Sequence, residues 1–170
     1  TTGKPVHIVL VEPEIPQNTG NVARTCAALG ADLHLVHPLG FSVDERAVRR
    51  AGLDYWHLVE VHEHDSLTLF LQSVASGAQI VLFTSHATVP FTSVDYRSDA
   101  FLVFGQETTG LPAEFVRSHP GPVVRIPMVG DARCLNLSNA VAVAAYEAAR
   151  QHDFSGLDLA RATDSSRTTS

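Results

Sequence analysis

Short apolar runs alternate with helical patterns along most of the chain, and this alternation predicts the fold. Six runs predict strands at residues 6–11, 33–36, 58–61, 80–84, 101–104 and 123–126. Several of these runs are continuously apolar, which is typical of parallel strands that are covered on both faces. Helical spacing predicts helices at residues 18–29, 44–51, 66–75 and 112–118, and an alanine-rich helix runs to residue 150. The order of elements therefore predicts an α/β fold with a mainly parallel sheet and helices on both faces.

Local signals indicate where the first helix begins and ends and where the ordered chain stops. Asn18 is a good N-cap and Gly30 a good C-cap for the helix between them. The 170 residues are of single-domain size. From about Ser155 the sequence is polar with nothing to bury. We therefore expect one domain over residues 1–154 and a disordered tail over residues 155–170.

Composition and charge argue against several classes of protein. A net charge of -6 does not suit a protein that coats nucleic acid, because such binding needs many Lys and Arg contacts to phosphate. No apolar run reaches the roughly 20 residues of a membrane helix, and no basic and then hydrophobic leader is visible. The chain also lacks the GxGxxG and P-loop patterns of dinucleotide enzymes and NTPases. We expect a soluble, cytoplasmic protein.

Cysteine and histidine spacing does not predict a metal site. Cys26 and Cys134 lie far apart without a CxxC partner, so we expect reduced thiols rather than a disulfide or a metal cluster. His62 and His64 would share one strand face, but no third ligand follows at metal-like spacing. Glu63, between them, would point to the other face. The sequence therefore predicts no bound metal.

Three polar loops, at residues 12–21, 105–112 and 128–139, each follow a predicted strand and lead into a predicted helix. Because ligands gather at the carboxyl ends of strands in open parallel sheets, these loops predict one shared site. In the second loop, Glu107 brings a carboxylate to a turn whose glycines allow a ligand to approach the backbone. Each loop alone also fits a structural interpretation, a helix cap or a tight turn.

The last loop and the helix after it carry more polar groups than one helix start needs. Capping accounts for one or two of Asp131, Arg133, Asn136, Ser138 and Asn139. Alanine leaves little side-chain bulk, so another backbone can approach this helix closely, inside the fold or across a symmetric dimer. The alanines are residues 140, 142, 144, 145, 148 and 149.

A small basic cluster lies in the predicted helix at residues 44–51. Helical spacing places Arg46, Arg49 and Arg50 on one side, where they could contact a phosphate backbone. A solvated helix face, with Asp44 and Glu45 favoured at its start, explains the same residues equally well.

In order and spacing, the three loops resemble the knotted RNA methyltransferases of the SPOUT superfamily. The match covers about residues 6–154, including Arg-Arg-Ala-Gly-Leu-Asp-Tyr at 49–55 and Phe-Gly-x-Glu-Thr-x-Gly at 104–110. It is strongest for the single-domain tRNA 2'-O-methyltransferases that act on the wobble nucleotide, position 34 of the anticodon loop. The resemblance implies a C-terminal deep trefoil knot, the cofactor S-adenosylmethionine, a tRNA anticodon stem-loop as substrate, and a homodimer.

The resemblance also assigns roles to individual residues. It implies a cofactor pocket made by Phe83, Thr84, Gly105, Ile126, Met128, Cys134 and Leu135. It makes Arg24 the central catalytic residue, assisted by Asn18, Glu107, Asn136 and Tyr146, while Arg46, Arg49, Arg50 and Ser138 would contact RNA. An arginine with a pKa above about 12 is a poor proton acceptor at neutral pH, so we expect Arg24 to clamp phosphate and to stabilise the developing alkoxide.

Two departures from the family pattern leave alternatives open. Cys134 stands where relatives commonly have serine, and Gln106 and Thr109 stand where relatives tend to have proline and arginine. A catalytically weak RNA-binding member is therefore one alternative, and a methyltransferase for another tRNA or rRNA site is a second. Against the latter, related rRNA enzymes usually carry an additional N-terminal domain, and about five residues precede the first predicted strand.

Overall fold

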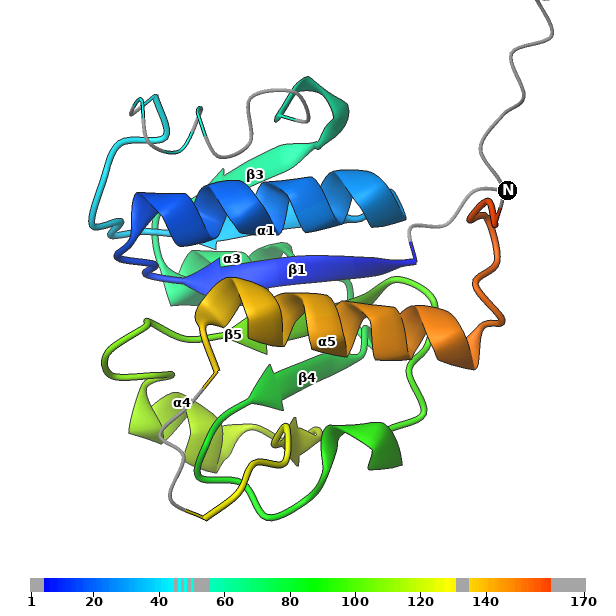
Figure 1. Ribbon diagram of the computed structural model, residues 1–170. Helices are drawn as coiled ribbons and strands as arrows, with labels where there is room; N and C mark the ends of the chain where they lie inside the picture. Colours follow the sequence, from blue (N-terminus) through cyan, green and yellow to red (C-terminus); the bar gives the residue numbers. More distant parts are fainter. Residues whose placement is uncertain are drawn as a thin grey trace, which may run out of the picture.

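The computed structural model describes residues 5–44, 46, 48, 50, 56–130 and 135–159. Within them, a six-stranded sheet forms the middle layer of the molecule (Figure 1). Its strand order is β3-β2-β1-β5-β4-β6, and all pairs of neighbours are parallel. The strands are β1 (Val6–Val11), β2 (Asp32–Val36), β3 (Val61–His64), β4 (Ile80–Phe83), β5 (Ala100–Phe104) and β6 (Val123–Val124). The predicted α/β fold with a parallel sheet is confirmed.

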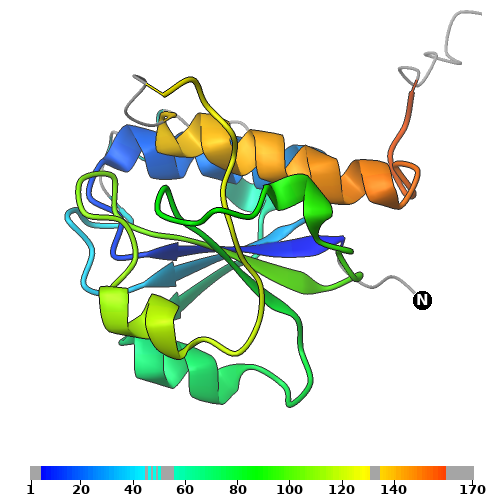
Figure 2. The same cartoon turned by 90° about the horizontal axis from the view of Figure 1, so that it is seen from below.

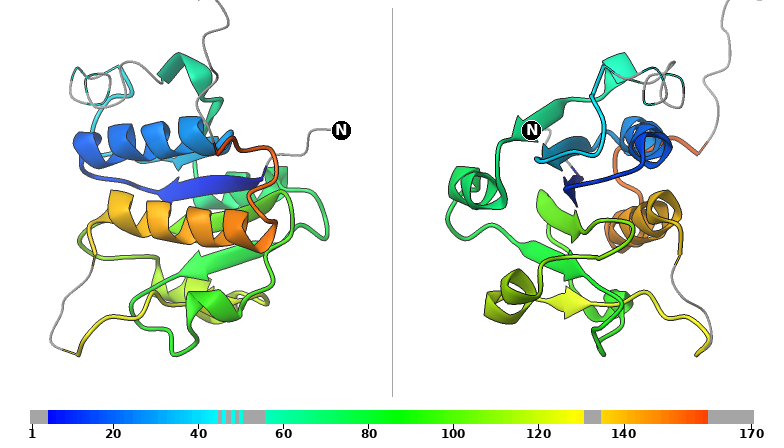
Figure 3. Two further views of the ribbon diagram at one scale, coloured as in Figure 1. Left: turned by 45° about the vertical axis from the view of Figure 1, so that its right-hand side comes forward. Right: turned by 90° about the vertical axis from the view of Figure 1, so that its left-hand side faces the viewer.

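Helices cover both faces of this sheet, as the sequence predicts. The α-helices are α1 (Pro16–Leu29), α3 (Leu67–Ser73), α4 (Ala113–Ser118) and α5 (Leu137–Gln151), and two 3-10 turns are η1 (Trp56–Leu58) and η2 (Phe91–Ser93). Helices α1 and α5 lie side by side on one face, whereas α3 and α4 lie on the other (Figures 2 and 3). None of the described helices is both long and apolar enough to cross a membrane.

Alternating strand side chains fill two cores. Ile8, Leu10 and other residues of one sheet face pack against α1 and α5, while Val9, Val11 and their neighbours pack against Phe70 of α3 on the opposite face. The first core takes in four alanines of α5: Ala144, Ala145, Ala148 and Ala149. Their small side chains let the backbone of α5 lie close to α1 and to the sheet. The alanine stripe is thus used inside the fold.

One predicted strand, at residues 58–61, is wrong. Residues 56–58 form η1, with Leu58 63 % exposed, and the strand begins only at Val61. Strand β3 reads Val-His-Glu-His and pairs with a neighbour on one side only. The apolar pattern misses it because its side chains on the α3 face include His62 and His64, whose partners in the fold are polar.

The start of the first helix and the end of the packed chain differ from the prediction. Helix α1 begins at Pro16 after Ile15, so Asn18 is not its N-cap, whereas Gly30 is the predicted C-cap with φ of 70°. The fold continues past residue 154, because Leu157 packs against the larger core. Residues 160–170 of the predicted tail lie outside the described residues. Of the predicted helix at 44–51, residues 45, 47, 49 and 51 also lie outside the described residues. The described residues 46, 48 and 50 are helical.

Candidate functional site

A cavity of about 400 Å³ opens at the carboxyl ends of β4 and β5. Segments that follow β1, β4, β5 and β6 meet around it, together with the start of α5. Described parts of all three polar loops therefore line one cavity, and the loop after β4 joins them. The lining residues are Ile15, Asn18, residues 83–86, residues 104–111, Arg125, Ile126, Met128, Leu135, Asn136, Leu137 and Ala140.

Glu107 ties the second loop to the first turn of α1. Its carboxylate accepts hydrogen bonds from the backbone N–H of Glu14 at 2.8 Å and of Ile15 at 3.1 Å, and from Nδ2 of Asn18 at 3.4 Å. The first N–H groups of a helix lack intrahelical acceptors, and their partial positive charge favours a carboxylate. Glu107 therefore caps α1 from a loop about ninety residues away in sequence.

Asn18 continues this network to the start of α5. Its side chain is buried, and its Oδ1 accepts from Nδ2 of Asn136 at 3.1 Å. Asn136 is the N-cap of α5, where its Oδ1 accepts from the backbone N–H of Ser138 at 3.0 Å and from its hydroxyl at 2.6 Å. Because each carboxamide has a donor on one side and an acceptor on the other, these contacts fix the orientation of both. The network accounts for Asn136 and Ser138 among the surplus polar groups, while Asp131 and Arg133 lie outside the described residues.

Two further hydrogen bonds join the first two loops, and in these the second loop donates and the first loop accepts. The Glu14 carboxylate accepts from the backbone N–H of Thr108 at 3.2 Å and from its hydroxyl at 2.5 Å. On its other side the Glu14 backbone lies against Gly40, where a Cβ would come within 2.8 Å of the Glu14 carbonyl oxygen. The backbone around Glu14 is therefore held from two sides, and the loops exchange hydrogen bonds in both directions.

Gly105 is required by the backbone that surrounds it. A Cβ at this position would lie 2.1 Å from the carbonyl carbon of Gly110 and 2.2 Å from the amide nitrogen of Leu111. Gly110 itself has φ of +70°, a conformation that other residues adopt at a cost. The two glycines therefore close a turn so tight that no side chain fits inside it.

The floor of the cavity is apolar. The rings of Phe83 and Phe104 stack with centroids 4.6 Å apart, and Ile126, Met128 and Leu135 complete this part of the wall. An apolar cavity of this size with a few fixed polar groups at its rim suits an organic ligand.

Most of the predicted cofactor residues line the cavity. They are Phe83, Thr84, Gly105, Ile126, Met128 and Leu135, while Cys134 lies outside the described residues. Of the predicted catalytic residues, Asn18, Glu107 and Asn136 also line it.

The remaining predicted site residues lie elsewhere. Arg24 is exposed on α1 and Tyr146 is 43 % exposed on α5, and neither lines the cavity. Ser138 is engaged with Asn136. Arg46 and Arg50 are exposed at helical positions, while position 49 lies outside the described residues.

Arg125 and His86 line the cavity but were not predicted as site residues. Arg125 was assigned to a strand, but β6 ends before it, and its backbone pairs with Val89 and Phe91. His86 follows the strand that carries Phe83, and its backbone N–H donates to the hydroxyl of Thr84 at 3.2 Å. The carboxyl-end rule for parallel strands was the signal that pointed to the loop of His86.

Gln106 and Thr109, which depart from the family pattern in the second loop, contact each other. The hydroxyl of Thr109 donates to Oε1 of Gln106 at 2.5 Å, and both residues line the cavity. Within the second loop they form a hydrogen-bonded pair across the turn.

Comparison with known proteins assigns this geometry to a family. Residues 5–146 match the SpoU rRNA Methylase family. The chain is 44 % identical over 156 residues to the tRNA (cytidine(34)-2'-O)-methyltransferase of Yersinia pestis, with 89 % of this chain and 96 % of that protein covered.

Comparison with solved structures supports the same family. One from work on the 2-OH methylation of C/U34 on tRNA is 47 % identical, with a TM-score of 0.84 and coverage of 88 % of this chain and 97 % of that one. The AdoMet complex of the SpoU methyltransferase AviRb from Streptomyces viridochromogenes is 25 % identical, with a TM-score of 0.80, and this chain covers 60 % of it. The family match extends over most of the residues, so the chain belongs to the SpoU rRNA Methylase family and has the SPOUT knot fold predicted from its sequence.

Proposed function

We propose that this protein transfers a methyl group from S-adenosylmethionine to the ribose 2'-hydroxyl of cytidine 34, the wobble nucleotide of tRNA. The observation that carries the proposal is the similarity from end to end with the Yersinia pestis enzyme, at 44 % identity over 96 % of that protein. A relative matched over one motif would share only a fold, whereas here all three loops and the cavity between them lie within the matched length.

The cavity suits S-adenosylmethionine, which supplies an electrophilic methyl group when it is bound. Its volume of about 400 Å³ lies within the range of small-molecule sites. Phe83, Phe104 and Ile126 offer apolar surface to the adenosine part, and the turn at Gly105 lets a ligand approach backbone groups directly. We assign cofactor binding to the six predicted residues that line the cavity, with Cys134 as a seventh candidate.

Asn18, Glu107 and Asn136 are assigned to positioning. The Glu107 carboxylate already accepts three hydrogen bonds within the protein, so both of its oxygens are engaged in holding the loops. Its task is to hold Asn18, and through Asn18 the carboxamide of Asn136, at the rim of the cavity. A fixed rim favours the transfer because the hydroxyl must be aligned with the methyl group.

Arg24 is assigned to the RNA rather than to the cofactor. It is exposed on α1, and arginine side chains in general are phosphate-binding groups and poor proton acceptors, so we assign Arg24 to holding a phosphate and stabilising the developing alkoxide. The proton would then pass to a phosphate oxygen or to solvent. Arg46 and Arg50, both exposed, are available for further phosphate contacts.

The proposed assembly is a homodimer. The exposed side of α5 carries Val143 and Tyr146, each 43 % exposed, and Ile15 and Leu135 add exposed apolar surface at the mouth of the cavity. A two-fold interface would bury this surface against its own copy. Light scattering at micromolar concentration should give twice the mass of one chain, and a monomer there would contradict the dimer.

Methyl transfer from labelled cofactor to unmodified tRNA tests the function. We expect label in tRNA, mapped to the 2'-O-methyl group of nucleotide 34. Paired tRNA transcripts with C or U at position 34 would define the accepted base. Calorimetry run alongside separates the alternatives, since cofactor binding without transfer to any tRNA would favour a binding protein, and transfer to rRNA alone would contradict the tRNA assignment.

A further inference from the structure

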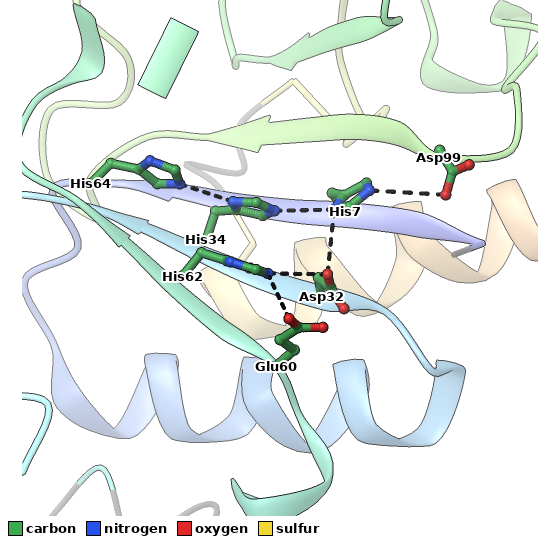
Figure 4. Close-up of polar contacts among 7 residues, drawn as sticks. All are labelled: His7, Asp32, His34, Glu60, His62, His64 and Asp99. Carbon is green, nitrogen blue, oxygen red and sulfur yellow. Dashed lines mark hydrogen bonds and ion pairs between the residues drawn. The ribbon is translucent and has the colours of Figure 1, made fainter. Parts of the chain in front are cut away.

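A cluster of histidines and aspartates lies on the α3 face of the sheet, near the amino ends of β1 and β2 (Figure 4). His7 comes from β1, Asp32 and His34 come from β2, and His62 and His64 come from β3. The strand register places His7 beside Asp32 and His34 beside His62. Side chains that are distant in sequence are thereby stacked across three neighbouring strands, and the proposed methyl-transfer chemistry uses none of them.

We propose that His7 Nδ1, Asp32 Oδ2 and His34 Nε2 bind a zinc ion. These three atoms lie within 4.8 Å of one another, with 3.0 Å between the two nitrogens and 3.9 Å between His7 and Asp32. Ligand atoms about 2 Å from a tetrahedral zinc ion are about 3.3 Å apart, so small side-chain shifts suffice. Two imidazoles and one carboxylate are a donor set that zinc accepts, with water as fourth ligand.

Each of the two histidine ligands also has a polar neighbour on the side away from the ion. His34 Nδ1 lies 3.0 Å from His64 Nε2, and His7 Nε2 lies 3.9 Å from Asp99 Oδ1. Ligating histidines usually hold their other ring nitrogen against such a partner, which fixes the tautomer and leaves the ligating lone pair free.

The Asp32 carboxylate has a histidine neighbour as well, at the same oxygen that would bind the ion. His62 Nε2 lies 3.1 Å from Asp32 Oδ2, and a carboxylate oxygen has a further lone pair for a metal. His62 also lies 3.9 Å from Glu60, which places a second carboxylate beside the cluster. The negative charge of two carboxylates beside the imidazoles attracts a dication.

Burial and access both suit a bound ion. Asp32 is 5 % and His34 7 % exposed, so the donors lie in a region of low dielectric, where attraction to a cation is strong. A neighbouring cavity of about 360 Å³, lined by His7, His34 and Asp99 among others, provides an entry path and space for a water ligand.

The sequence interpretation missed this site because Asp32 and His34 lie on β2 whereas His7 lies on a different strand, β1. His62 and His64 were considered as metal ligands because of their spacing in the sequence. In the structure, however, these two residues contact the proposed ligands His34 and Asp32 and are not ligands themselves. The ligands themselves are separated by 27 residues between His7 and His34, with no motif to connect them.

Zinc titration of the full chain, without a histidine tag and after treatment with chelator, tests the proposal. We expect saturable binding of one equivalent by calorimetry, and visible absorption bands of tetrahedral cobalt when Co²⁺ replaces Zn²⁺. Asp32→Asn and His7→Gln should each weaken zinc binding more than 100-fold. His64→Gln and Asp99→Asn, which alter only the outer partners, should weaken it about 10- to 100-fold.

His57→Gln is the matched control, because His57 is exposed in η1, which packs against α1 on the opposite face of the sheet. It should leave the affinity unchanged. Circular dichroism of each variant confirms that the fold persists, so a loss of binding is attributable to the ligands. The absence of saturable binding by the wild type, or binding that survives both Asp32→Asn and His7→Gln, would overturn the proposal.

Discussion

Removing the negative charge of Glu107 is the perturbation that best tests how the three loops are held together. Replacing Glu107 by glutamine keeps the shape of the side chain but turns one carboxylate oxygen into an NH2 donor. In the structure both oxygens accept hydrogen bonds, from the N–H groups of Glu14 and Ile15 and from Asn18. A glutamine can therefore satisfy only some of these donors, and it brings a new donor against another N–H group.

The expected cost follows from those contacts. A hydrogen bond to a charged group contributes about 1.5–3 kcal/mol, and a carboxylate at a helix N-terminus about 0.3–1 kcal/mol more. Glu107 is half-buried, so the lower end of each range applies, and the sum is about 2 kcal/mol. For a chain of this length that corresponds to a decrease of about 4–8 °C in Tm. If the same energy is needed to order the cavity rim, cofactor affinity falls about 30-fold.

Urea unfolding and calorimetric titration with S-adenosylmethionine measure the two effects. Glu114→Gln is the matched control, because Glu114 pairs with Arg117 at 2.8 Å on the surface, where both side chains are mostly exposed, and should change stability by less than about 0.5 kcal/mol. A double-mutant cycle with Asn18→Ala should give a coupling of at least about 0.5 kcal/mol. If Glu107→Gln matches the control in stability, or the cycle shows no coupling, the network does not hold the loops.

Three further predictions concern single positions. Gly105→Ala should destabilise the protein by about 3 kcal/mol or more in urea unfolding, because its methyl group meets backbone at 2.1 Å, whereas Gly130→Ala, with no atom within 4 Å, should be nearly neutral. Burial raises the pKa of Cys26 from 9.0 to about 12, so in Cys134→Ser protein alkylation of the native thiol should stay slow through pH 10; rapid native-state modification at pH 9 would contradict this. Arg24→Ala should abolish methyl transfer while cofactor binding is unchanged, and Arg24→Lys should retain part of the activity; near-normal turnover of the alanine variant would refute the clamp.

The fold was predictable wherever one local signal dominated. Continuous apolar runs located β1 to its exact ends, and the αL glycine at position 30 ended α1 as predicted. The pattern failed at β3, because an edge strand whose inward side chains are histidines has no apolar signature. The knot depends on how distant segments thread, which no local periodicity encodes, so only the family resemblance predicted it.

The site was predictable as a set of loops but not as a set of contacts. The carboxyl-end rule predicted that the loops share one site, and the surplus of polar groups in the last loop indicated more than a helix cap. The sequence could not show that Asn18, predicted as a cap, instead links Glu107 to Asn136, because these two partners lie 89 and 118 residues away along the chain. The proposed zinc ligands were not predictable for the same reason, because their donor atoms come close together only when β1 and β2 pair in register.

Tyr146 is the assigned catalytic residue whose position constrains the mechanism most. Ten residues separate it from Asn136 on one helix, and a rise of 1.5 Å per residue places the two about 15 Å apart along the axis of α5. That distance exceeds the width of a nucleoside, so both side chains of one chain cannot contact the same 2'-hydroxyl. Tyr146 lies with Val143 on the exposed side of α5, where a two-fold interface would place it against the partner copy. A role for Tyr146 at the ribose therefore requires the dimer, whereas the role of Asn136 does not.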